Sequence, residues 1–259
     1  MKVISHLLET AKYAVLEAGK VIMEVYGSAE YRTEIKPDET PVTTADRLSH
    51  AVITKYLETT DLPVLSEEGM HIDFRERCNW EYFWLIDPLD GTKEFINKNG
   101  EFTINIALVS KNKPVAGVIY APCRDALFLG CEETGVSKYE NGNQIEFEPL
   151  KERRRFQDLL NKGEITVVVS RSHFSAETKE FLKQFSNVTL TTLGSSLKFM
   201  LLLESNADIY PRLGRTMEWD TAAAHAILNA SNRGIYHMDL KSELSYNKPD
   251  LTNSFFVAF

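Results

Sequence analysis

The chain has 259 residues, of which 43% are hydrophobic and 25% charged, proportions typical of a folded globular protein rather than a disordered or fibrous one. Its formal net charge of -8 argues against general nucleic-acid binding, which depends on Lys and Arg neutralising phosphates. A negative net charge remains compatible with a small anionic ligand. Carboxylates can bind metal cations, and these cations then present positive charge to the ligand.

The cysteines and the N-terminal residues indicate where the chain resides. Cys78, Cys123 and Cys131 form no CxxC pair, so a disulfide scaffold or thiolate zinc site is not expected, and a reducing cytoplasm is the expected location. Residues 1–27 lack the apolar core and cleavage site of a signal peptide. No stretch approaches a membrane span in length, which leaves only peripheral membrane association open.

Two helices are expected first along the chain. Apolar residues recur at helical spacing over residues 4–25, and Gly27 is well placed to stop this helix. A second helix is predicted to begin near Thr43 or Thr44, which are natural N-caps, and it carries Asp46 in its first turn.

Short apolar runs separated by turn signals predict strands in the middle of the chain. The predicted strands cover residues 63–65, 82–86, 103–109, 115–120, 127–129 and 145–147. Turn signals at residues 111–114 and at Asn141-Gly142 suggest an antiparallel meander. Because these strands lack regular helical crossovers, the α+β class is predicted.

Residues 151–164 are rich in charge and poor in strand signal, which makes them the best candidate for a junction between two subdomains, 1–155 and 156–259. The first would carry the main metal-binding motifs, and the second would contribute Asp220 and substrate contacts. Beyond the junction the predicted elements are strand 165–169, helix 175–185, strand 188–191, helix 196–205, helix 220–228, and strands near Ile235 and Phe255.

The most informative motif is the segment 87–92, DPLDGT, which directly follows an apolar strand. Pro88 restricts the backbone, so the chain turns sharply and both acids and the Leu89 carbonyl can face one point. Hard cations such as Mg²⁺ prefer such oxygen ligands. A helix starting near Gly91 would direct free backbone N–H groups at a phosphate held there. Alternatively, Asp-Pro and Asp-Gly are simply turn formers.

Three further acidic sites favour the metal interpretation. They are Glu67-Glu68 after a short strand, Asp46 in a helix start, and Asp220 after Trp219 before an Ala-rich helix. Each has an ordinary explanation: a solvated loop, a helix-dipole partner and an N-cap, respectively. Their joint occurrence with the segment 87–92 favours one shared site.

Together these motifs, in this order and spacing, resemble the lithium-sensitive magnesium phosphatases of the inositol monophosphatase superfamily. The resemblance runs through nearly the whole chain, and the segments 91–96 and 100–105 look like the bacterial bisphosphate nucleotidase branch. It implies a fold layered αβαβα, with the metal site between an N-terminal and a C-terminal subdomain.

The resemblance also implies a set of metal ligands, which are Glu67, Asp87, Leu89 through its carbonyl, Asp90 and Asp220. Glu67, Asp87 and Leu89 would hold one Mg²⁺, and Asp87, Asp90 and Asp220 a second. A third, weaker ion near Glu67 is left open. Two cations about 3.5 to 4 Å apart can stabilise the entering and leaving oxygens of an in-line displacement, so no covalent enzyme intermediate is needed.

Asp46 and Thr92 match the pair that in this family orients and deprotonates the attacking water. The implied substrate contacts are Glu67, Leu89, Asp90, Gly91, Thr92, His173, Ser195, Ser196, Lys198, Arg212 and Asp220. Ser196 or its neighbour could cap the following helix while Lys198, in its first turn, reaches a second phosphate.

Arg212 offers a planar fork for phosphate or a purine, and His173 could bond a phosphate or ribose. Taken alone, an Arg after a Tyr-Pro turn is usually solvated and a lone His is usually structural. The remaining histidines lack metal-ligand spacing, so no zinc site is expected; they are His6, His50, His71, His225 and His237. The chain departs from the branch at Ala224, where Gly is common, and at residues 232–234.

The resemblance implies hydrolysis of adenosine 3',5'-bisphosphate to AMP and phosphate, with 3'-phosphoadenylyl sulfate as a related substrate. The rival enzyme is an inositol monophosphatase or broad sugar phosphatase that uses the same metals. A catalytically silent nucleotide-binding protein is the alternative from another class. The sequence leaves the oligomeric state open.

Overall fold

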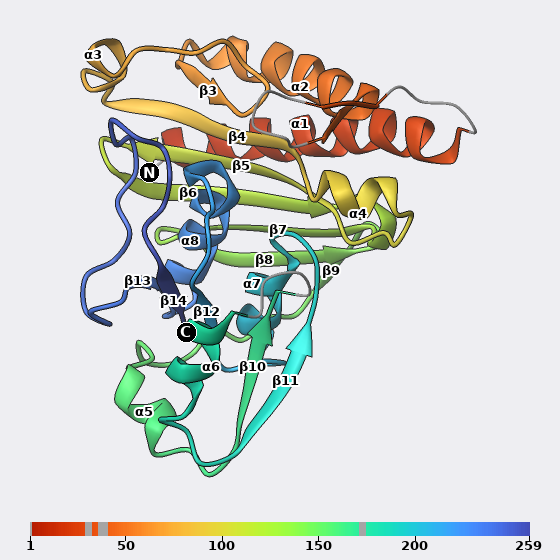
Figure 1. Ribbon diagram of the computed structural model, residues 1–259. Coiled ribbons are helices and arrows are strands. Elements are labelled where there is room, and N and C mark those ends of the chain that lie inside the picture. The colour runs from red at the N-terminus through yellow and green to blue at the C-terminus, as the bar shows by residue number, and fades with distance from the viewer. Residues whose placement is uncertain (1, 29–32, 36–40, 171–174) are drawn as a thin grey trace.

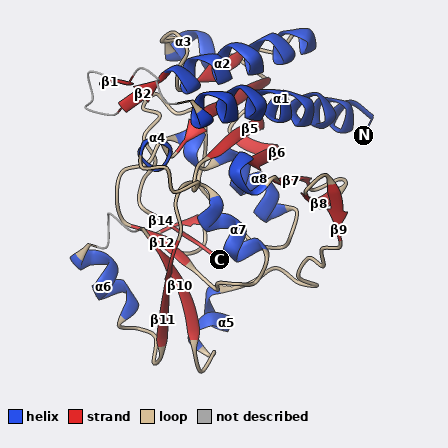
Figure 2. Cartoon of the chain, turned by 90° about the vertical axis from the view of Figure 1, so that its right-hand side faces the viewer, coloured by secondary structure: helices blue, strands red, loops and turns tan. Residues whose placement is uncertain are grey.

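The computed structural model describes residues 2–28, 33–35, 41–170 and 175–259. Its elements stack in layers, which Figures 1 and 2 show from two sides. From the top of Figure 1, helices α1 (Lys2–Gly27) and α2 (Thr44–Leu57) cover a large sheet, and helices α7 (Leu197–Leu203) and α8 (Ala222–Asn229) lie below it. Two small sheets lie at the bottom, with helices α5 (Phe156–Leu160) and α6 (Ala176–Leu182) beside them. The predicted α+β class and αβαβα layering are confirmed.

Among the described residues, the large sheet has seven strands in the order β3-β4-β5-β6-β7-β8-β9. They are β3 (Val64–Ser66), β4 (Tyr82–Asp90), β5 (Thr103–Ser110), β6 (Lys113–Ala121), β7 (Ala126–Cys131), β8 (Gly135–Glu140) and β9 (Asn143–Ile145). Strand β3 pairs parallel with β4, and the other strands form the predicted antiparallel meander. The prediction missed β8, since all its residues are half-buried and no apolar alternation marks it.

Short elements complete the N-terminal half. They are β1 (Thr33–Ile35), β2 (Pro41–Thr43), α3 (Phe74–Arg77), α4 (Thr92–Ile96), and two 3₁₀ turns, Glu58–Thr60 and Pro122–Arg124. The predicted turn at residues 111–114 is wrong in its second half, because β6 already begins at Lys113. The predicted strand 145–147 is displaced, because β9 ends at Ile145.

The small sheets lie in the C-terminal half. Strands β10 (Ile165–Val169) and β11 (Val188–Thr192) pair in parallel, and β12 (Tyr210–Arg212), β14 (Phe256–Ala258) and β13 (Ile235–His237) form an antiparallel sheet in that order. The predicted Tyr-Pro turn is instead strand β12. Pro211 is tolerated because β12 lies at an edge of its sheet. Residues 151–164 contain α5, and a division into subdomains at 155/156 stays a prediction.

The central strands of the large sheet, β5, β6 and β7, are buried on both faces. Along β5, Ile104, Ile106 and Leu108 belong to the apolar cluster under α1 and α2, whereas Ala107 and Val109 belong to the cluster shared with α7 and α8. A third cluster joins α5 and α6 to β10. Because successive side chains of a strand point to opposite faces, the polar residues at the start of β5, Thr103 and Asn105, lie on the same face as Ala107 and Val109.

Helix α8 lies directly on strand β6, at Gly117. A Cβ atom at Gly117 would lie 2.2 Å from the carbonyl oxygen of Ala223, so only glycine permits this approach. Ala222, Ala223 and Ala224 are buried at the contact. The small residues of both elements therefore fix the position of α8.

Two further observations concern membranes and thiols. No helix in the described part of the chain is both long and apolar enough to cross a membrane. Cys78, Cys123 and Cys131 are free thiols, and Cys131 is buried in strand β7.

We expect Gly117→Ala to lower stability by about 1 to 3 kcal/mol, since the added methyl group forces α8 away from β6. In thermal unfolding this corresponds to a Tm lower by roughly 2 to 10 °C. Gly27→Ala is the matched control, because a Cβ atom there meets nothing within 4 Å. Equal Tm values for the two variants would contradict the close approach.

Candidate functional site

The segment that carries Asp87 and Asp90 forms a bulge in strand β4. Asp87 pairs with Asn105 and Asp90 pairs with Thr103. Between these two pairs β4 therefore contains one residue more than β5, which is the definition of a bulge. The predicted end of this strand at residue 86 is therefore too early. The hydroxyl of Ser49 in α2 donates to the Pro88 carbonyl at 2.7 Å and fixes the bulge from the helix side.

A cavity of about 310 Å³ brings most of the predicted site residues together. The predicted residues that line it are Glu67, Asp87, Leu89, Asp90, Gly91, Thr92, Ser195, Ser196, Lys198, Arg212 and Asp220. The prediction did not include the other lining residues, which are Lys93, Glu94, Ser170, Phe199, Tyr210, Thr216, Thr221 and Phe256. His173 lies outside the described residues.

Asp46 reaches the cavity through Thr92. Its Oδ2 atom accepts bonds from the backbone N–H and the hydroxyl of Thr43 at 2.7 and 2.6 Å, which is the capping box of α2. Its Oδ1 atom accepts the Thr92 hydroxyl at 3.1 Å. Burial raises the pKa of Asp46, and the bonds from Thr43 oppose that rise. One oxygen is thus anchored in the scaffold, and the other is directed at Thr92.

Several carboxylates crowd around Asp87. Burial raises the pKa of Asp87 well above its usual range, and the charges of Glu67, Asp90 and Asp220 raise it further. Burial likewise raises the pKa of Asp220, with the charges of Asp90 and Glu67 adding to the effect. An all-oxygen donor set whose members destabilise each other's charge suits a hard divalent cation.

The carboxylates are nevertheless not drawn into a tight cluster. Within the ranges that the structure describes, no group of three His, Cys, Asp or Glu side chains is close enough to hold a metal ion as it stands. Other donors account for the positions of two of them. Met217 N donates to Asp220 Oδ2 at 2.8 Å, and Ser195 Oγ donates to Asp90 Oδ2 at 2.7 Å.

The loop before α7 binds Asp90. Ser196 Oγ donates to Asp90 Oδ2 at 3.0 Å and accepts from Asn105 Nδ2 at 2.9 Å. Thr103 Oγ1 bonds Ser195 Oγ. Ser196 occupies the N-cap position of α7, but its side chain makes no capping bond: its backbone is already helical, with φ -66° and ψ -8°, and its oxygen accepts from Asn105.

The prediction did not select Thr103 and Asn105. The two side chains are buried, and they lie on the face of β5 opposite to Ile104 and Ile106. A polar side chain that alternates with apolar ones in a strand buried on both faces is the signal that could have identified them.

Lys198 and Arg212 bring positive charge to the same cavity. Lys198 Nζ lies 5.8 Å from the centre of the Tyr210 ring, and burial together with the nearby Arg212 lowers its pKa to about 8. Arg212 donates to the Arg215 carbonyl at 3.1 Å, while its Nε is buried with no hydrogen-bond partner in the described chain. These two cations can therefore bind an anionic group beside the carboxylates.

The comparisons with known proteins show which family the chain belongs to. The profile of the Inositol monophosphatase family matches residues 4–254. The 3'(2'),5'-bisphosphate nucleotidase CysQ of Escherichia coli (strain K12) is 43% identical over 228 residues, which cover 85% of each chain. CysQ of Haemophilus influenzae is 35% identical over 256 residues, which cover 97% of this chain and 92% of that protein.

Solved structures give the same result. The crystal structure of CysQ from Bacteroides thetaiotaomicron, described as a bacterial member of the inositol monophosphatase family, aligns with a TM-score of 0.83 and 41% identity and covers 97% of this chain and 96% of that chain. Inositol monophosphatase from Anabaena aligns with a TM-score of 0.69 at 23% identity, covers 100% of this chain and 91% of that chain, and shows the shared fold alone. The chain belongs to the inositol monophosphatase family.

Proposed function

We propose that the chain is a magnesium-dependent 3'(2'),5'-bisphosphate nucleotidase that converts adenosine 3',5'-bisphosphate and water to AMP and phosphate. The observation that carries this proposal is the pair of cations, Lys198 and Arg212, in the same cavity as the carboxylates. A bisphosphate needs positive charge for the phosphate that is not hydrolysed, whereas an inositol monophosphate has no second phosphate to bind. The identity to several CysQ nucleotidases supports the same choice.

The oxygens of five residues would hold Mg²⁺: Glu67, Asp87, Leu89, Asp90 and Asp220. The all-oxygen chemistry of this set and the buried position of Asp87 support a hard cation, and two ions, with a third left open, stay a prediction. When bound, the ions supply Lewis-acid chemistry, because they stabilise charge on phosphoryl oxygens and make water a better nucleophile.

Asp46 and Thr92 are suited to position and deprotonate the attacking water. The Thr92 hydroxyl donates its proton to Asp46 Oδ1, so its oxygen lone pairs are left to accept a bond from water in the cavity. The proton released by that water can pass through Thr92 to Asp46 Oδ1. Since Thr43 occupies the other oxygen of Asp46, the carboxylate keeps its orientation during the transfer.

The remaining substrate contacts stay predictions. Gly91, Ser195 and Ser196 line the cavity, and Gly91 has a backbone φ of 92°, which a residue with a side chain rarely adopts. Contact of His173 with a phosphate or ribose, action on 3'-phosphoadenylyl sulfate and a cytoplasmic location also belong to the proposal.

The first test compares phosphate release from adenosine 3',5'-bisphosphate and from inositol 1-phosphate, each with Mg²⁺ and with a chelator. We expect release from the nucleotide to dominate and to stop with the chelator. Preference for the inositol ester would overturn the proposed substrate while leaving the metal chemistry in place. Tight nucleotide binding without release from either compound would favour a silent binding protein.

Asp90→Asn is expected to reduce turnover by orders of magnitude at constant Mg²⁺, because the variant loses a charged metal ligand. Steady-state kinetics on adenosine 3',5'-bisphosphate measure this effect. Asp61→Asn is the matched control, since Asp61 is exposed on a turn with a φ of 56° that asparagine also adopts. Near-normal turnover of Asp90→Asn would rule out the ligand assignment.

Lys198→Ala is expected to raise KM for adenosine 3',5'-bisphosphate by about 10- to 100-fold and to leave KM for inositol 1-phosphate unchanged. The estimate corresponds to about 1.5 to 3 kcal/mol for a hydrogen bond between charged groups. An equal effect on both substrates would show that Lys198 does not recognise the second phosphate.

The pH dependence provides a separate test of Lys198. Its pKa of about 8 means that the ammonium group is charged below pH 8 and loses its proton above it. In the wild type, KM for the bisphosphate should therefore rise as pH increases through 8. Lys198→Arg keeps its charge, so its KM should stay flat over the same range. Identical pH profiles for the two proteins would contradict the assignment.

A further inference from the structure

Two of the proposed metal ligands lie on loops that are far apart in the sequence. Glu67 follows strand β3, and Asp220 ends the short 3₁₀ helix Glu218–Asp220 before α8. A third segment, residues 245–253, contacts both loops through buried polar groups. We call this segment the strap.

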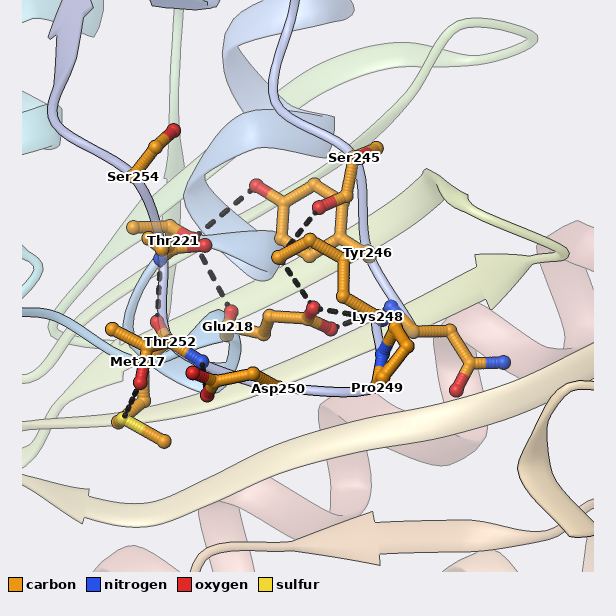
Figure 3. Close-up of polar contacts among 12 residues, drawn as sticks. Met217, Glu218, Thr221, Ser245, Tyr246, Lys248, Pro249, Asp250, Thr252 and Ser254 are labelled. Atoms are coloured by element: carbon orange, nitrogen blue, oxygen red, sulfur yellow. Dashed lines mark hydrogen bonds and ion pairs between the residues drawn. The ribbon is translucent and has the colours of Figure 1, made fainter. Parts of the chain in front are cut away.

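Glu218 binds the strap from the Asp220 side. Its carboxylate is fully buried and accepts the backbone N–H groups of Asn247 and Lys248 at 2.6 and 3.1 Å, together with the Lys248 ammonium group. Figure 3 shows the Glu218 side chain pointing at Lys248. The Glu218 N–H donates to the Leu251 carbonyl at 2.9 Å. Glu218, two positions before Asp220, is therefore bound to the strap through both its backbone and its side chain.

A second contact joins the Asp220 turn to the strap. Asn253 Nδ2 donates to the Met217 carbonyl at 2.7 Å and to Thr221 Oγ1 at 3.0 Å. Met217 N in turn donates to Asp220 Oδ2 at 2.8 Å. The strap therefore binds Met217, which precedes Asp220, and Thr221, which follows it. Met217 also orients the Asp220 carboxylate directly.

Arg77 binds the strap from the Glu67 side. Its side chain is buried at 2% exposure, and its Nε donates to the Ile72 carbonyl at 3.0 Å, which closes the loop that follows Glu67. The guanidinium donates to Asn247 Oδ1 at 2.7 Å and to the Lys248 carbonyl at 3.2 and 3.3 Å. Asn247 Nδ2 returns a bond to the Arg77 carbonyl at 2.8 Å.

Asn247 and Lys248 are thus held between a buried cation and a buried anion. Burying such charges costs free energy that apolar side chains would avoid, so this arrangement suggests a role beyond stability. The cavity supplies one, because Glu67 and Asp220 line it together with Asp87 and Asp90, and the repulsion among these like charges tends to separate the loops of Glu67 and Asp220. A rigid connection between these loops opposes that separation before any cation binds.

We propose that Arg77 and Glu218 are positioning residues for divalent-metal binding. Both bind the strap, from opposite sides, and thereby hold the loops of Glu67 and Asp220 at a fixed position relative to each other. The proposal rests on the proposed function for the identity of the metal ligands. Neither residue lines the cavity, so each acts through the ligand loops rather than on the substrate.

The test measures Mg²⁺ binding by titration calorimetry, without substrate, in Arg77→Gln and Glu218→Gln. We expect each variant to bind Mg²⁺ about 10-fold or more weakly, the size found when groups that orient metal ligands are lost. Phosphate release should need correspondingly more Mg²⁺ and recover most of its kcat at saturation. An unchanged Mg²⁺ affinity in both variants would overturn the proposal.

Arg233→Gln is the matched control for the loss of a buried guanidinium group. Arg233 is 1% exposed and donates to the Ser231 carbonyl and to Ser205 Oγ. We expect this variant to lose stability, measured as Tm, but to keep its Mg²⁺ affinity. A loss of Mg²⁺ affinity equal to that of Arg77→Gln would mean that general destabilisation explains both results.

Asn247→Gly is the second variant, for the case that Arg77→Gln does not fold. Asn247 has a φ of 59°, which glycine adopts easily, and the change removes only the side-chain bonds to Arg77. It should weaken Mg²⁺ binding several-fold, and an unchanged affinity would count against the proposal. If the wild type binds Mg²⁺ but does not hydrolyse the nucleotide, the proposed function fails while these comparisons still decide the role of the strap.

Discussion

Repulsion among buried carboxylates is the constraint on which the rest of the site depends. Asp87 is almost completely buried, and the charges of Glu67, Asp90 and Asp220 all act on it. Such a group cannot keep its charges without compensation, so it must take up protons or bind cations. The carboxylates therefore make a site for divalent ions only if the fold holds them near one another despite their repulsion.

The fold meets this constraint through contacts between segments that are distant in sequence. The bulge in β4 places Asp87 and Asp90 at the same cavity, and Ser195 and Ser196 bind Asp90 from the opposite half of the chain. Helix α8 is set by its close approach to Gly117 and follows directly after Asp220. Asp87, Asp90 and Asp220 are thus each held by an element whose position depends on the packing of the layers.

Local sequence signals predicted most of the helices and strands, whereas the layering and the proposed metal ligands followed from the family resemblance. The helix start at Thr43, strand β10 and the meander each follow from short-range patterns, which need no knowledge of the tertiary structure. Strand β8 lacks such a pattern, and Ser196, which with its neighbour was a candidate cap for the following helix, makes no capping bond. In both cases the local structure depends on a tertiary contact, and the pattern of apolar residues along the sequence carries no information about that contact.

The same reasoning explains why Arg77, Thr103 and Asn105 escaped prediction. Arg77 lies 170 positions from Asn247, and Asn105 lies 91 positions from Ser196, so neither pair has a spacing that marks it. The motif of Asp87 and Asp90 was predictable because these residues lie within one short segment and their oxygens suit hard cations. The residue types that orient this motif occur throughout proteins and do not by themselves indicate a function. Their role becomes apparent only from the residues that they contact in the folded chain.

In the proposed assignment, metal binding and substrate choice rest on different parts of the chain. Strand β4, the loop after β3 and Asp220 supply negative charge, whereas α7 and β12 supply Lys198 and Arg212. Replacing these cations would change which anion binds without removing any proposed metal ligand. With this division, the substrate can change while the hydrolytic reaction stays the same. The reason is that the binding energy of the phosphate that does not react is separate from the stabilisation of the phosphate that does react. The lowered pKa of Lys198 ties that binding energy to pH.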